Sequence, residues 1–66
     1  MIQVMSERLL VEREVAERLG MAVQTVRGWR VRGCGPVYVK LGRSVRYRES
    51  DVEAFVRAGR VERGEP

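Results

Sequence analysis

The chain has 66 residues, a formal net charge of +4, no histidine and a single cysteine. A chain this short supports one thin core, which leaves little room for an enclosed catalytic pocket. With no histidine and Cys34 alone, neither a disulfide nor a four-ligand zinc site can form within it. We therefore expect that the protein is not an enzyme and that it binds neither a metal nor a cofactor. No apolar run approaches the roughly 20 residues that span a bilayer, which predicts a soluble cytoplasmic protein without membrane contact.

The charges are unevenly placed along the chain. All nine acidic residues lie at or before Glu17, or at or after Glu49. The stretch from Arg18 to Arg48 contains eight positive charges and no acid. A solvated face usually mixes both signs, whereas clustering of one sign is typical of a protein that binds a polyanion. A membrane surface would require a basic amphipathic helix, which this stretch does not resemble, so the pattern favours nucleic acid.

Two helices joined by a short turn are predicted in the first half of the chain. The first has apolar residues at helical spacing, namely Val11, Val15, Ala16 and Leu19. They predict a helix over 12–19 that ends at Gly20, where a positive φ is easily adopted. A second helix follows the turn, with Val26 and Trp29 facing the core, and ends near Arg32 before two glycines and a proline. Helices joined by so short a turn cross steeply, which is typical of a helix-turn-helix.

Residues 37–48 change to a period of two, which predicts a β-hairpin. A three-residue loop over 42–44 would pair Leu41 with Val45 and keep one face apolar. A two-residue loop would pair Lys40 with Val45 and mix the faces, which a half-buried hairpin resists. We therefore predict the longer loop. Val39 then pairs with Tyr47, and the solvated face carries Tyr38, Lys40, Arg46 and Arg48.

A third helix is predicted after the hairpin. Ser50 and Glu53 have the spacing of a capping box, which predicts Ser50 as the N-cap. The predicted inward residues are Val52, Phe55 and Val56, and Gly59 ends the helix. The predicted fold class is α+β, a small winged helix-turn-helix in the order helix, helix, β-hairpin, helix. It occupies residues 9–59, between an N-terminal arm over 1–8 and a disordered tail over 60–66; the first five residues either pack on the core or contact another protomer.

The second helix has an outward face that can read base edges. Gln can bridge adenine, Arg can bridge guanine, and the methyl groups of Val or Thr can contact thymine. The candidate DNA-binding residues of this helix are Val23, Gln24, Thr25, Arg27, Gly28 and Arg30. Val23 either contacts the groove or packs as a hydrophobic staple. Gly28 costs about 1 kcal/mol relative to alanine in a helix, and it reflects close approach to DNA, chance drift, or easier packing of Trp29.

The hairpin supplies the second set of candidates. Its DNA-binding residues are predicted to be Lys40, Arg43, Ser44, Arg46 and Arg48. Arg43 at the loop tip suits the narrow minor groove, where arginine is favoured. Contacts to backbone phosphates are predicted for Lys40, Arg46 and Arg48. A simply solvated sheet face is the alternative interpretation of these three, although no acid lies among them.

The ordered set of motifs resembles the excisionase-type winged helix-turn-helix domains, which are related to the DNA-binding domain of MerR-type regulators. The residues that carry the resemblance are Leu9-Leu10, Glu14 to Gly20, Thr25-Val26, Trp29, Lys40 to Tyr47 and Ser50 to Phe55. The resemblance implies that the second helix lies in the major groove and that Arg43 enters the adjacent minor groove. The sequence departs from the family pattern at Val11 and Ala22, where a capping residue is common.

The resemblance also implies a function. Stand-alone members of this family often act as recombination directionality factors, which bind and bend attachment-site DNA and favour excision by an integrase. The implied partners are double-stranded DNA, a phage-type integrase and further copies of the chain on DNA, in a bacterial or phage-encoded system. A small transcriptional regulator is the alternative of the same class. A protein-interaction module such as an anti-repressor would need an acidic surface, which the basic centre lacks.

Overall fold

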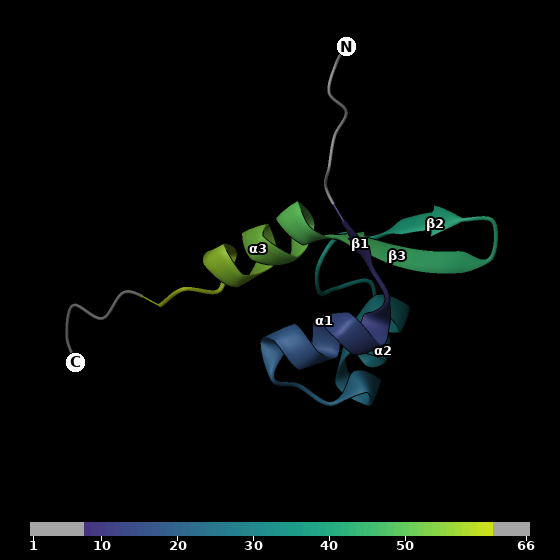
Figure 1. Cartoon of the computed structure of the whole chain (residues 1–66). Helices are drawn as coiled ribbons and strands as arrows, with labels where there is room; N and C mark the ends of the chain where they lie inside the picture. Colours follow the sequence, from purple (N-terminus) through teal and green to yellow (C-terminus); the bar gives the residue numbers. More distant parts are fainter. Residues whose placement is uncertain (1–7, 62–66) are drawn as a thin grey trace, which may run out of the picture.

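The computed structural model of the chain describes residues 8–61. Its elements are β1 (Leu9–Leu10), α1 (Glu12–Leu19), α2 (Val23–Arg32), β2 (Val39–Leu41), β3 (Ser44–Arg48) and α3 (Glu49–Ala58). In Figure 1 the β2–β3 hairpin and α3 extend in opposite directions above the α1–α2 pair. Three helices and a three-stranded antiparallel sheet confirm the predicted α+β winged helix-turn-helix class. Most of the predicted arm (1–8) and tail (60–66) lies outside the described residues.

Each helix of the α1–α2 pair ends at a glycine that adopts a left-handed conformation. Gly20 follows α1 with φ 66° and Gly33 follows α2 with φ 78°, both left-handed, as glycine permits without strain. The helix starts are less well capped, because neither Val11 nor Ala22 supplies a side-chain cap. At α1 the Glu14 carboxylate accepts from the Val11 N–H at 3.0 Å instead, which satisfies one of the unpaired donors there.

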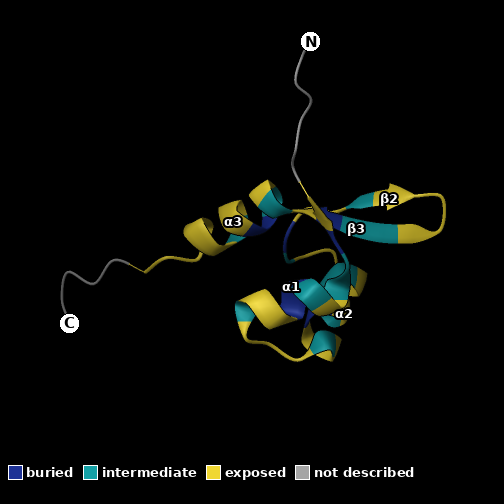
Figure 2. Ribbon diagram, in the orientation of Figure 1, coloured by how far each residue is buried: buried dark blue, intermediate teal, exposed yellow. Residues whose placement is uncertain are grey.

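The core lies where the helix pair meets β1, β3 and the start of α3 (Figure 2). Its buried side chains are Leu10, Val15, Ala16, Val26, Tyr47 and Val52, with Leu19, Val23, Trp29 and Val45 packed against them. The Trp29 ring contacts Phe55 at 5.2 Å between ring centroids. Val56 was expected to face inward but is 54% exposed. Because α3 points away from the helix pair, only its first two turns reach the core.

The predicted hairpin register is wrong. Leu41 pairs with Ser44 and Lys40 with Val45, so the turn contains two residues, Gly42 and Arg43, rather than three. Gly42 has φ 65°, and a glycine at the first central position is what the type II′ hairpin turn requires. Its twist matches that of the strands, which favours the shorter turn.

This register mixes the two faces of the hairpin, contrary to the prediction. Val39 pairs with Arg46 and lies on the outer face with Leu41, which is 54% exposed, while Lys40 shares the face of Val45. Residues 40–44 are all exposed, and Figure 2 shows the tip in yellow beyond the helix pair. Because no element within residues 8–61 covers either face there, mixing apolar and polar side chains on one face carries little penalty.

The start of α3 also differs from the prediction. Leu9 and Leu10 form a strand, β1, that pairs with β3 up to Arg48, and the N–H of Glu49 donates to the carbonyl of Arg8 at 3.3 Å. The helix therefore begins at Glu49, directly after the strand, and Arg48 is its N-cap without a side-chain cap bond. The predicted Ser50 cap is wrong, because the sheet fixes the backbone two residues before the capping motif.

Candidate nucleic-acid interface

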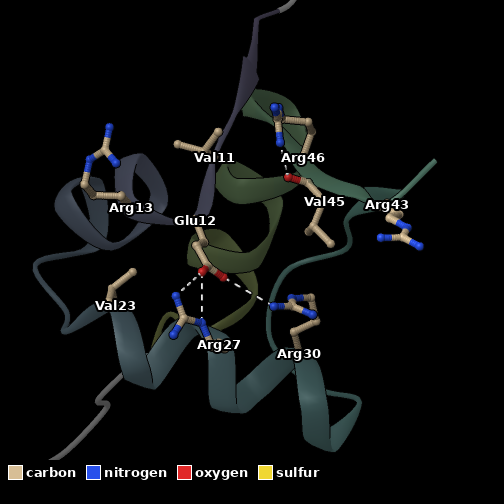
Figure 3. Close-up of a pocket in the computed structure, with 9 residues that line it drawn as sticks. All are labelled: Val11, Glu12, Arg13, Val23, Arg27, Arg30, Arg43, Val45 and Arg46. Carbon is tan, nitrogen blue, oxygen red and sulfur yellow. Dashed lines mark hydrogen bonds and ion pairs between the residues drawn. The ribbon is translucent and has the colours of Figure 1, made fainter. Parts of the chain in front are cut away.

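An open groove of about 600 Å³ lies between the start of α1, α2 and the hairpin (Figure 3). It is lined by Val11, Glu12, Arg13, Val23, Arg27, Arg30, Arg43, Val45 and Arg46. Five of these nine residues are arginines and one is acidic. We call this surface the arginine groove. Its concave shape and dense positive charge suit a polyanion more than a neutral ligand.

The structure brings half of the predicted recognition-helix residues into the arginine groove. Val23, Arg27 and Arg30 line it, and Val23 also packs partly against the core. Gln24 and Thr25 are exposed in the first turn of α2, outside the groove lining. The helix therefore presents arginines toward the hairpin and shorter polar side chains beside them.

Gly28 also lies outside the groove lining, and it does not make room for the Trp29 ring. A Cβ on Gly28 would meet only the flexible end of Arg32, whose Nη1 would lie at 3.2 Å. Gly35 is the glycine that the ring requires, since a Cβ there would lie 2.7 Å from the Trp29 Cβ. Within the described residues, no packing contact therefore requires a glycine at position 28.

The predicted wing residues separate into two groups. Arg43 and Arg46 line the arginine groove, and Arg46 donates to the Val45 carbonyl at 2.8 Å. Lys40 and Ser44 are exposed on the hairpin but outside the groove lining. Arg48 lies at the far end of β3, where its Nε donates to Asp51 at 2.9 Å. The structure therefore does not bring Arg48 to the hairpin tip.

Sequence reasoning missed Glu12, the acidic residue of the arginine groove. Its Oε2 accepts from the Nε of Arg27 at 2.9 Å and from the Nη2 of the same side chain, and its Oε1 accepts from the Nη2 of Arg30 at 3.4 Å. The hydrogen bond from Arg27 is the main reason that the pKa of Glu12 lies below its usual range, and this pairing raises the pKa of Arg27. Glu12 belongs to the acidic flank of the sequence. Only the crossing of α1 over α2 brings it to the basic centre.

Arg30 is the more deeply set of the two arginines that Glu12 binds. Its side chain is 25% exposed, against 53% for Arg27. Its Nε is buried without a hydrogen-bond partner among the described residues. Burial raises the pKa of the Tyr47 hydroxyl, and the nearby Arg30 guanidinium partly opposes that effect. Arg30 therefore forms the floor of the groove, while Arg27 remains accessible.

The remaining ion pairs show where positive charge stays uncompensated. Arg8 pairs with Glu14 at 2.7 Å and Arg18 with Glu49 at 2.6 Å. The cations of the acid-free stretch that form no ion pair with a described acid are Arg32, Lys40, Arg43 and Arg46. Three of these four belong to the hairpin, so the uncompensated charge of this stretch gathers there.

Within residues 8–61, no helix is long and apolar enough to cross a membrane, and no group of His, Cys, Asp or Glu side chains is suited to hold a metal ion. A family model described as a helix-turn-helix domain matches residues 12–60, from the start of α1 to just beyond α3. No curated protein and no solved structure matches the chain. Because the family match covers most of the sequence and all three elements around the arginine groove, the chain belongs to the helix-turn-helix domain family, a family of DNA-binding domains.

Proposed function

We propose that this chain is an architectural DNA-binding protein of the excisionase type. In this proposal residues 9–59 form the binding unit, α2 lies in the major groove of a duplex, and the hairpin tip reaches the adjacent minor groove. The observation that supports it is the arginine groove between α2 and the hairpin. One sugar–phosphate strand separates neighbouring major and minor grooves, so a domain that enters both must cover that strand with positive charge.

The roles of the side chains follow from their pairing and exposure. Arg43 and Arg46 pair with no described acid, so their charges are available to phosphates or to the minor groove. The exposed residues of the first turn of α2, Gln24 and Thr25, suit base edges, as does the accessible Arg27. Further DNA contacts at the edges of this interface come from Val23, Lys40 and Ser44. Arg48 is bonded to Asp51, and we assign it a phosphate contact of lesser weight.

The excisionase role predicts more than binding. Such a protein occupies repeated sites beside an attachment site, bends the DNA, and works with a phage-type integrase and with neighbouring copies of itself. The support for this role is the resemblance of the motifs together with the helix-turn-helix match. The basic groove argues against the anti-repressor alternative, which needs an acidic surface that imitates DNA.

The decisive experiment is footprinting on the DNA that flanks the protein's own gene, followed by a circular-permutation gel assay for bending. Repeated protected sites with a bend are the expected result. One isolated protected site without a bend would favour the transcriptional regulator instead. If about five phosphates are engaged, the logarithm of the binding constant should fall with the logarithm of salt at a slope of about −4.5. Absence of any duplex binding at low salt would overturn the proposal.

A further inference from the structure

We infer that Glu12 is a positioning residue for sequence readout, because it holds Arg27 so that the open end of the guanidinium presents two parallel donors to a guanine. The inference rests on the proposed function, since it requires α2 to lie in the major groove. It deepens that function by assigning the base that Arg27 reads and the residue that prepares Arg27 to read it.

Glu12 occupies only part of the Arg27 guanidinium. A guanidinium carries five N–H groups in one plane. Glu12 Oε2 accepts from Nε and from Nη2 of Arg27, which occupies the side edge of that plane. Both N–H groups of Nη1 and the second N–H of Nη2 remain. One from each nitrogen forms the end-on fork that matches O6 and N7 of guanine, so Glu12 leaves the reading fork unused.

Glu12 also restrains the Arg27 side chain in the free protein. The Arg27 side chain is 53% exposed, and a long exposed side chain that is unsupported loses rotamer freedom when it binds. Glu12 is itself well fixed, because it is the first residue of α1, is 22% exposed, and also accepts from Arg30 through its other oxygen. Figure 3 shows Arg27 and Arg30 converging on this one carboxylate. Arg27 is thus oriented before DNA arrives, which is how a second layer of contacts prepares a binding residue.

Glu12 also disfavours a phosphate as the ligand of Arg27. Glu12 is the one acid among the residues that line the arginine groove. Its negative charge offsets that of Arg27 and repels a phosphate that approaches the same guanidinium. Arg43 and Arg46 of the hairpin have no such acidic partner among the described residues and stay available to the backbone. Glu12 therefore favours the base edge over the phosphate for Arg27 and acts on specificity more than on total affinity.

The test begins with selection of duplex sites from a random-sequence library by the wild-type chain. Fluorescence anisotropy then gives Kd for the selected duplex and for duplexes in which each guanine is replaced singly. Arg27→Ala identifies the guanine that Arg27 reads. Glu12→Gln should lower the discrimination at that same guanine by about five- to tenfold, within the range of one bidentate contact. Discrimination at other positions should not change, and random-sequence duplex should bind at least as tightly as with the wild type.

Two controls separate this role from a general effect of charge. Glu17→Gln removes one negative charge from an exposed position of the same helix and should leave discrimination at every guanine unchanged. The double variant Glu12→Gln/Arg27→Ala should lose no more discrimination than Arg27→Ala alone, because both changes remove one contact. Circular dichroism on each variant verifies that it is folded.

A measurement on the wild-type chain keeps the test valid if Glu12→Gln does not fold. Relaxation of the arginine Nε–H groups by NMR should show Arg27 more rigid than Arg43 in the free protein. Equal mobility of the two side chains would overturn the inference, and so would unaltered or evenly reduced discrimination in Glu12→Gln. Failure of the wild type to select any site or to bind any duplex would instead overturn the proposed function on which the inference rests.

Discussion

Two arginines of α2 and two of the hairpin line the same groove but differ in how they are held. Arg27 and Arg30 share the carboxylate of Glu12, whereas Arg43 and Arg46 pair with no acid in the described part of the chain. A fixed donor can distinguish one base from another, while a phosphate requires only nearby charge. Under the proposed function, α2 would therefore read the base sequence while the hairpin attracts the phosphate backbone.

The two regions also differ in what they contribute to folding. The helix pair supplies Val15, Ala16 and Val26 to the core. The hairpin supplies Tyr47 and, in part, Val45, and both precede its junction with α3 rather than lie at the tip. Substitutions of these core residues in the helix pair should therefore alter stability and binding together, and substitutions at the tip should alter binding alone.

The largest effect is expected from a substitution that removes the packing between α2 and the core. Trp29→Ala should destabilise the domain by about 3 kcal/mol, at the low end of the usual cost for this truncation, because the ring is only partly buried against the core and Phe55. Urea unfolding followed by circular dichroism measures the change. Tyr38→Ala is the matched control, since that ring contacts Tyr47 in a tilted arrangement but is 40% exposed. A Trp29→Ala variant as stable as the wild type would mean that the inward face of α2 is misassigned.

A smaller effect, on binding alone, is expected at the hairpin tip. Arg43→Ala should weaken duplex binding about tenfold, because it removes one charged contact worth roughly 1.5 kcal/mol. The salt slope should become shallower by about 0.9. The urea midpoint should stay at the wild-type value, since residues 42–44 are exposed. Unchanged affinity at physiological salt would remove the tip from the interface.

Gly28 offers a way to separate stability from binding within α2. Gly28→Ala should stabilise the helix by about 1 kcal/mol, because the added methyl group meets only the movable end of Arg32. If the helix approaches DNA closely at this point, the same variant should bind duplex more weakly. Thermal unfolding and anisotropy on one sample measure both quantities. A variant that is more stable and binds equally well would leave chance drift as the explanation of this glycine.

The smallest effect is a dependence of stability on pH. The pKa values of Glu12 and Glu14 are lowered in the folded state, chiefly by the hydrogen bonds from Arg27 and from the Val11 N–H. Their contribution is fully present above the unfolded value of about 4.5 and is lost as pH falls through the lower folded values. Both carboxylates are partly exposed and two of their arginine partners, Arg8 and Arg27, are more than half exposed, so the loss should be modest and weaker in high salt. Urea midpoints between pH 6 and pH 3 test this, and Glu12→Gln should show a shallower decline.

The helix pair was predictable because two independent signals coincide there. The apolar stripe fixes the face and period of α1, and Gly20 fixes its end, so the predicted range 12–19 is the observed one. The same reasoning places the end of α2 at Arg32. Such local signals need no knowledge of the rest of the chain.

The errors arose where distant segments decide the outcome. The preference for an apolar hairpin face assumed cover along its whole length, but the tip lies beyond the helix pair. The capping motif at Ser50 was overridden because β1, almost 40 residues earlier, pairs with β3 up to Arg48. Glu12 was missed for the same reason, since an ion pair between two helices depends on how they cross and has no sequence period.

The two-residue turn has a consequence for how such a domain can diversify. The conformational demand of the turn falls on Gly42, whose φ is 65°, while Arg43 beside it has no positive φ. Position 43 can therefore accept many side chains without loss of fold, and position 42 cannot. Related proteins could acquire new targets by exchanging one tip residue at a time, with each intermediate still able to fold. We expect sequence variation to be broad at position 43 and glycine to persist at position 42.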